Sequence, residues 1–141
     1  MVISTIRTLY ENQKPGTRID DDAVAKSGNF TTTTKNGTRR IVMPTGETLS
    51  IINGSGAAGR RYAIDFYTKD KNICSHLASV KYGTSHFATE VVSKNGKVSL
   101  VDDLLKRPAA DRYLTVSEAA LKCSTLIGSG NEVRVYMAFK G

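Results

Sequence analysis

The sequence predicts a single α+β domain over residues 1–141, with an N-terminal helix packed on a mostly antiparallel β-sheet. Three observations predict this fold class. Apolar residues recur at helical spacing at the start of the chain, whereas strand-like alternation dominates from residue 40 onward. An Asn95-Gly96 pair gives the strongest short hairpin signal in the chain. Residues 133–139 alternate cleanly, which is typical of a strand with one face on a core.

The N-terminal segment predicts an amphipathic helix that Pro15-Gly16 ends. Its apolar face consists of Val2, Ile3, Ile6, Leu9 and Tyr10. Because this helix begins without a cap, we expect residues 1–12 to be the C-terminal part of a longer helix. A second short helix is predicted from Asp20-Asp21-Asp22 through Lys26, with acids at the positive end of the helix dipole.

The middle of the chain predicts three strands, at residues 40–43, 48–52 and 61–67. The preceding threonines at 31–34 and Asn36-Gly37 are interpreted as an exposed, turn-rich loop. Thr68 is expected to cap a helix that runs to about Lys81, with Ile73, Leu77 and Val80 on one face.

The C-terminal half predicts a hairpin of residues 87–92 and 97–101, a helical turn at 102–107, and a further helix. Thr115 and Glu118 have the spacing of a capping box, so the helix that carries Cys123 should begin there. The final strand should enter the sheet with one apolar face toward the helices: Val133, Val135, Met137 and Phe139.

Charge and hydropathy exclude some classes of protein. The chain has 20 Lys and Arg against 13 Asp and Glu, a net charge of +7, which favours acidic partners without specifying one. Uninterrupted aliphatic stretches are only a few residues long, whereas a spanning helix needs about 20 apolar residues. The sequence as written therefore contains no predicted membrane span.

No motif in the sequence predicts catalysis, a cofactor or a bound metal. Residues 54–59 match the dinucleotide pattern G-x-G-x-x-G, but a strand pattern follows instead of the helix that would hold a pyrophosphate. Cys74 and His76 are two residues apart on a predicted helix, so they point in different directions. His76 and His86 are interpreted as histidines without a catalytic role.

Nucleic acid is not expected to be the main ligand. Two arginine pairs, at residues 39–40 and 60–61, have Tyr62, Tyr67 and Tyr82 nearby. Single-strand binding needs a clustered basic patch with stacking aromatics, and no recognised module gathers these residues. The arginine pairs flank predicted strands, where solubilising charges are common.

The two cysteines, Cys74 and Cys123, are not part of a C-x-x-C pair, which argues against a zinc ribbon or a thioredoxin-type site. An even count is consistent with a disulfide in an oxidising compartment. Two buried free thiols in a cytosolic protein would have the same spacing, so pattern alone leaves both interpretations open.

Taken in order, several segments resemble the globular part of a type IV pilin, most closely the type IVb subgroup. Val2-Ile-Ser-Thr-Ile-Arg-Thr-Leu-Tyr10 resembles the end of the long first pilin helix. Tyr62-Ala-Ile-Asp-Phe66, followed by Ile73-Cys74-Ser-His-Leu77, resembles the strand and helix that carry the family's first cysteine. Glu118-Ala-Ala-Leu-Lys-Cys123 and the last strand resemble the second cysteine and the family's terminal strand.

The resemblance implies a pilin-like fold and a disulfide between Cys74 and Cys123 that bounds the exposed D-region. It also implies a structural subunit rather than an enzyme, whose partners are other copies of itself and the pilus assembly machinery. A host or bacterial surface receptor is a further implied partner. The implied location is an extracellular pilus on a Gram-negative bacterium, after a stage anchored in the inner membrane.

Two other functions remain open at this point. The positive charge and the arginine pairs are consistent with a secreted or periplasmic module that binds an acidic ligand. A pseudopilin of type II secretion is the related alternative, which the cysteine-bounded segment favours less than a type IVb pilin.

Overall fold

The computed structural model describes residues 9–10, 19–28, 30–53, 61–97, 101–104, 106–128 and 130–140. Their helices are α2 (Asp21–Ser27), α3 (Lys71–Ser79), α4 (Val101–Leu104), α5 (Val116–Ile127) and the short 3₁₀ helix η1 (Ala109–Asp111). The strands are β1 (Thr32–Lys35), β2 (Thr38–Ile41), β3 (Ser50–Asn53), β4 (Arg61–Thr68), β5 (His86–Ser93) and β6 (Val133–Lys140). Helices and antiparallel sheets in one chain confirm the predicted α+β class.

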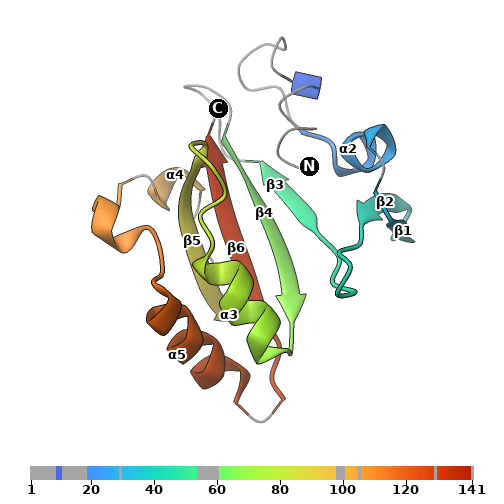
Figure 1. The fold of residues 1–141 in the computed structure, drawn as a ribbon. Helices are drawn as coiled ribbons and strands as arrows, with labels where there is room; N and C mark the ends of the chain where they lie inside the picture. Colours follow the sequence, from blue (N-terminus) through green and yellow to red (C-terminus); the bar gives the residue numbers. More distant parts are fainter. Residues whose placement is uncertain are drawn as a thin grey trace.

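The main sheet has four antiparallel strands in the order β3-β4-β6-β5 (Figure 1). β6, the last strand in the chain, lies between β4 and β5 and pairs with β4 from Arg61↔Lys140 to Thr68↔Val133. A central strand has a neighbour on both edges, so its backbone is paired on both sides. The predicted entry of the terminal strand into the sheet is confirmed.

Helices α3 and α5 pack against each other and against one face of the sheet (Figure 1). The four apolar residues predicted to face the helices belong to this main core, which confirms the predicted face of β6. Side chains from the neighbouring strands complete it because paired residues share a face: Tyr62, Ile64, Phe66 and Val91.

The opposite face of the sheet carries a smaller apolar cluster. Ala63, Ala88 and Ala138 lie side by side on three neighbouring strands, and Tyr136 and Leu104 are fully buried with them. Because alanine is short, α4 can place Leu104 close to the sheet. Among the helices of the described segments, none is long and apolar enough to cross a bilayer.

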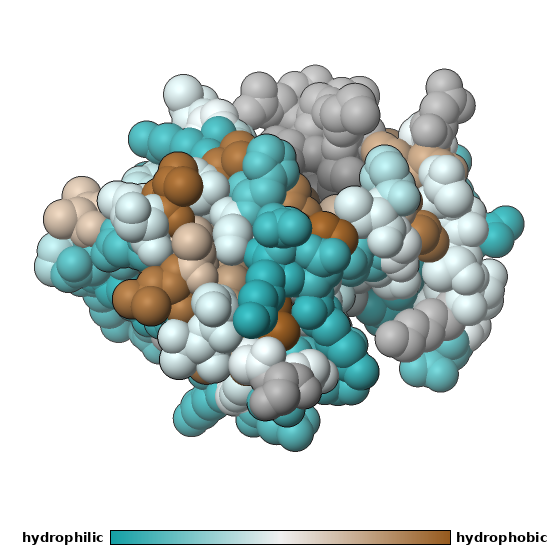
Figure 2. All heavy atoms as spheres, turned by 60° about the horizontal axis from the view of Figure 1, so that its bottom comes forward, coloured by the Kyte–Doolittle hydropathy of each residue, from teal (hydrophilic) through white to brown (hydrophobic). Residues whose placement is uncertain are grey.

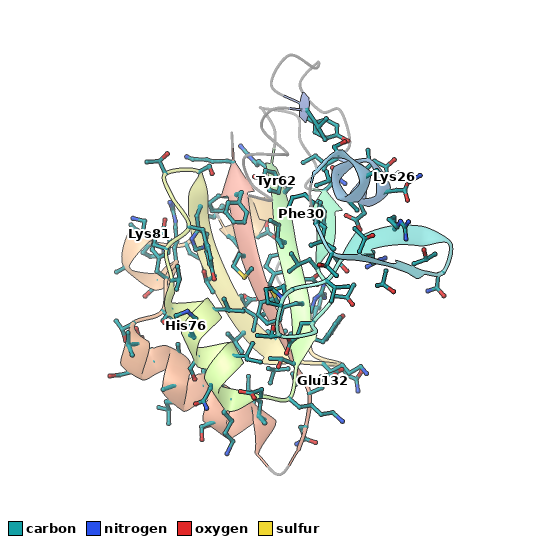
Figure 3. All side chains as sticks on the ribbon, turned by 45° about the vertical axis from the view of Figure 1, so that its right-hand side comes forward. Lys26, Phe30, Tyr62, His76, Lys81 and Glu132 are labelled. Atoms are coloured by element: carbon teal, nitrogen blue, oxygen red, sulfur yellow. A yellow bond between two sulfur atoms is a disulfide. The ribbon has the colours of Figure 1, made fainter. Side chains whose placement is uncertain are left out.

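A smaller lobe, made of α2 and the β1–β2 hairpin, docks on the free edge of β3. The Asp21 carboxylate accepts a hydrogen bond from the Ile51 N–H at 2.9 Å, and Leu49 N–H donates to the Ile41 carbonyl at 2.9 Å. These contacts occupy backbone groups that an edge strand would otherwise leave open. Figure 3 shows the hairpin projecting sideways from the sheet.

The interpretation of residues 31–34 as a loop is wrong for residues 32–34, which lie in strand β1, whereas the turn expected at Asn36-Gly37 is present. Thr32–Lys35 pairs with Thr38–Ile41 around a two-residue turn, where Asn36 and Gly37 have φ of 52° and 81°. Such turns require positive φ at both positions, and Asn-Gly meets that requirement best. Threonine is β-branched and favours strands, which outweighs its polarity here.

The hairpin predicted around Asn95-Gly96 is described only in its first strand and its turn. Gly96 N–H donates to the Ser93 carbonyl at 2.8 Å, so a turn is present. However, Val101 begins α4 and the partner of β5 is β6. Residues 98–100 lie outside the described residues.

Helix boundaries differ slightly from expectation. Asp70, not Thr68, caps α3, and its carboxylate accepts hydrogen bonds from Asn72 and Ile73 N–H. Thr68 ends β4 instead, and α3 stops at Ser79. Asp20 caps α2 much as predicted.

Most of the predicted N-terminal helix lies outside the described residues. Leu9 and Tyr10 are helical, and Tyr10 belongs to the main core. The Tyr10 hydroxyl accepts a hydrogen bond from Asp20 N–H at 3.0 Å. This end of the predicted helix is therefore attached to the smaller lobe.

Candidate functional site

Cys74 and Cys123 are joined by a disulfide, with an S–S distance of 2.03 Å and a Cα–Cα distance of 5.9 Å. Cys74 comes from the middle of α3 and Cys123 from the middle of α5, and both are fully buried in the main core. The bond closes a loop with a sequence separation of 49 residues. The loop contains β5 and α4, so the cross-link ties a large surface segment to the sheet.

The start of α5 is fixed by the predicted capping box. The Thr115 hydroxyl accepts from Glu118 N–H at 3.1 Å, and the Glu118 carboxylate accepts from Thr115 N–H at 3.0 Å. These backbone bonds hold the pKa of Glu118 below its usual value. The helix then exposes Val116 and Leu121, at 73% and 71% of their surfaces. Figure 2 views this end of the molecule and shows separate brown side chains among polar ones.

The two histidines have different environments. His86 is buried, and its Nδ1 accepts a hydrogen bond from Tyr82 N–H at 3.0 Å. Its Nε2 therefore carries the proton and lies 2.9 Å from the Ala88 carbonyl. Burial lowers the pKa of His86 to about 4, so the ring is neutral at pH 7. His76 is exposed on α3 while its neighbour Cys74 is in the disulfide.

No group of three or more potential metal ligands occurs within the described ranges. Residues 54–59, the glycine pattern, lie outside the described residues.

Within the described ranges, which leave out Arg60, the arginines and tyrosines considered for nucleic acid lie in separate parts of the fold, although Arg40 and Tyr67 both line the recess described below. Arg39 is exposed on the β1–β2 hairpin. Arg61 is the first residue of β4, at the opposite end of that strand from Thr68. Tyr62 stacks on Phe139 with ring centroids 5.2 Å apart and is buried. The Tyr82 hydroxyl donates to the Leu77 carbonyl at 2.8 Å. Because Tyr62 is buried, its ring cannot stack on a base, whereas the Tyr67 side chain is 37% exposed.

A buried ion pair on the sheet was not predicted from the sequence. Asp65 of β4 is 2% exposed and accepts a charge-assisted hydrogen bond from Nε of Arg134 on β6. The Arg134 guanidinium lies 5.8 Å and 5.7 Å from the ring centroids of Tyr67 and Tyr136. Burial raises the pKa of Asp65 above its usual value, and the nearby Arg134 opposes that rise. The sequence feature that could have indicated this pair is Asp65, an acidic residue within the otherwise apolar run of residues 62–66.

This pair borders a recess of about 900 Å³ between the main sheet and the smaller lobe. Figure 2 shows the two parts separated by a hollow. Its lining includes four carboxylates: Asp21, Glu47, Asp65 and Glu132. It also includes four basic side chains: Arg40, Lys69, Lys94 and Arg134. Figure 3 labels Glu132 near the C-terminal end of β4.

The comparisons with known proteins identify a family. The model of the Bundlin family matches residues 1–140, nearly the whole chain. No curated protein and no solved structure matches it. The α+β fold and the disulfide between α3 and α5 agree with the pilin resemblance of the sequence. The chain therefore belongs to the Bundlin family, a family of type IV pilin-like proteins.

Proposed function

We propose that this chain is a type IVb pilin whose pilus mediates adhesion or cell aggregation. Membership of the Bundlin family makes it a pilin-type structural subunit, which assembles with other pilin subunits into an extracellular pilus on bacteria. The observation that carries the proposal is the family match over residues 1–140. The subtype, the adhesive role and a Gram-negative host are our extension of it.

The disulfide-bounded segment supports the type IVb assignment. The cross-link between α3 and α5 encloses most of the second half of the chain and fixes it on the sheet. Within this segment α5 exposes Val116 and Leu121, two large apolar side chains. Exposed apolar side chains on a surface that must contact neighbouring copies can exclude water on assembly.

Charge sets a condition on assembly. Each copy carries a net charge of +7, so copies repel one another at low salt. A filament therefore needs an apolar driving force, worth about 25 cal/mol for each Å² removed from water. In our proposal an apolar helix that continues the N-terminal helix supplies it, and also holds the subunit in the inner membrane before assembly.

The first test is the coding sequence upstream of Met1. A basic leader followed by about 20 apolar residues is the expected result, because that length spans a bilayer. An ordinary cleaved signal peptide without such a stretch would contradict the proposal. That outcome would favour a secreted or periplasmic binding module.

The second test is deletion of the gene in its host, with complementation. We expect surface fibres and cell aggregation to disappear and to return with the wild-type gene. Complementation with Cys74→Ser should restore fewer fibres, while the neighbouring change Ser75→Ala serves as a matched control. Unchanged fibres and unchanged aggregation in the deletion strain would contradict the proposal.

A further inference from the structure

The recess between the main sheet and the smaller lobe holds charges of both signs close together. Asp65 projects from β4 on one side, and Arg40 reaches in from β2 on the other, where it also binds the Ser50 hydroxyl. Asp21 contributes a third charge from the first turn of α2. Three separate elements therefore converge on the same space.

Two buried polar atoms at this recess have no hydrogen-bond partner in the part of the chain that the structure describes. They are the Asp65 Oδ1 oxygen and the Arg40 Nε nitrogen. The other carboxylate oxygen of Asp65, Oδ2, accepts a hydrogen bond from Arg134. Asp65 as a whole is 2% exposed, so Oδ1 belongs to a buried carboxylate. A buried charged group with an unmade hydrogen bond is costly, and native proteins seldom leave one.

The two atoms need opposite partners. Asp65 Oδ1 needs a donor, whereas the Arg40 Nε–H needs an acceptor. Burial also raises the pKa values of Asp21 and Asp65, although the Arg40 guanidinium opposes the rise at both carboxylates and Arg134 opposes it at Asp65. A simple anion would satisfy Arg40 and repel the carboxylates. A simple cation would satisfy Asp65 and leave Arg40 without an acceptor.

We propose that this recess binds a small zwitterion, whose ammonium group donates to Asp65 Oδ1 and whose carboxylate accepts from Arg40 Nε–H. Amino acids with a free amine and a free carboxylate are the ligand class. The recess, at about 900 Å³, is within the range of small-molecule pockets. No covalent step is involved.

The Arg40 side chain provides a direct readout. In the ¹⁵N-labelled 141-residue protein, the Nε–Hε resonance of Arg40 is followed by NMR during titration with glycine, β-alanine and γ-aminobutyrate. These probes differ only in the spacing of their two charges. We expect at least one to move this resonance saturably, with the best spacing giving the lowest Kd.

Two controls separate binding from general salt effects. Glycine betaine keeps both charges but has no N–H to donate, so it should bind at least about tenfold more weakly than glycine. Ammonium acetate at equal ionic strength supplies the two charges unlinked, and should give no saturable shift. Equal shifts with these compounds, or no shift with any amino acid, would overturn the proposal.

Variants test the two named atoms. Asp65→Asn removes the negative charge and should weaken the best probe by at least about tenfold, as followed by backbone amide shifts. Arg40→Lys removes Nε–H and should weaken it similarly, and it keeps the test valid if Asp65→Asn does not fold. Asp103→Asn, at an exposed acid on α4, is the matched control and should bind normally. Wild-type binding in both recess variants would refute the assignment.

Discussion

At the scale of single residues, the pair of Asp65 and Arg134 shows how a strand can hold a charge inside a sheet. Strict alternation in residues 133–139 places Arg134 on the polar side of β6, where exposure would be expected. Instead its side chain is 17% exposed and lies near two tyrosine rings. A buried pair contributes little net stability, but removing one partner strands the other charge.

We therefore predict that Arg134→Met lowers the free energy of unfolding by about 3–5 kcal/mol at pH 7. The loss should shrink as pH falls, because the pKa of Asp65 would rise further and the folded variant would take up a proton before the unfolded chain does. Urea unfolding at several pH values measures both effects. The double variant with Asp65→Asn should be more stable than Arg134→Met alone, and equal stability would contradict this account.

His86 gives a second prediction, because its pKa of about 4 in the folded protein is below the usual 6.5. Between these values the unfolded chain binds more protons than the folded one. His86 should therefore cost stability as pH falls from 6.5 to 4, by about 3 kcal/mol in total, with no further loss from this group below pH 4.

Urea unfolding of wild type and His86→Gln at each pH isolates this contribution, because the acidic groups titrate in both proteins. Between pH 6.5 and pH 4 the free energy of unfolding of the wild type should fall by about 3 kcal/mol more than that of His86→Gln. His76→Gln, at the exposed histidine of α3, should retain the wild-type profile. A His86→Gln profile parallel to the wild-type profile would show that His86 keeps its ordinary pKa.

At the scale of elements, β6 is the strand on which the sheet depends. Val135 is fully buried, and it pairs with Phe66 on one side and Val91 on the other. Val135→Asp would bury an unpaired charge there, so we predict a loss of several kcal/mol or failure to fold.

Thermal unfolding followed by circular dichroism measures this change. Lys140→Asp, at the exposed end of the same strand, should change the melting temperature much less. Similar small losses at the two positions would mean that Val135 does not face the core.

The elements also show what the sequence could predict. The capping box of α5 and the apolar alternation of β6 are local signals, and local hydrogen bonds and burial decide both. The β1–β2 hairpin was missed because its threonines are polar, although Asn36-Gly37 carried the correct turn signal. The recess joins Arg40, Asp65 and Arg134, which are far apart in sequence. The pairing of β4 with β6 brings Asp65 close to Arg134, and the docking of the smaller lobe adds Arg40 from β2.

The disulfide links the element scale to the whole molecule. In the chain-entropy model a cross-link with this loop length contributes about 4 kcal/mol by restricting the unfolded chain. We predict that the double variant Cys74→Ser, Cys123→Ser loses about 4 kcal/mol of unfolding free energy, which is measured as a lower urea midpoint. Mass spectrometry after alkylation should find no free thiol in the native, unreduced protein. Two alkylated cysteines there would contradict the cross-link.

At the scale of the whole molecule, the fold gives the filament subunit a cross-linked head. The disulfide and the central strand β6 fix α3 and α5 on the sheet, and the smaller lobe covers the edge of β3. Such a head can keep its shape while it contacts neighbouring copies. A net charge of +7 means that contact between heads alone should be weak at low salt.

Immunogold electron microscopy of the host cells shows whether this chain is the building block of a surface fibre. Antibodies raised against the 141-residue protein are applied to intact cells of the wild type and of the deletion strain. We expect gold particles along the whole length of surface fibres in the wild type, and neither label nor those fibres in the deletion strain. Fibres that carry no label, with the protein found only as a soluble periplasmic species, would contradict this expectation.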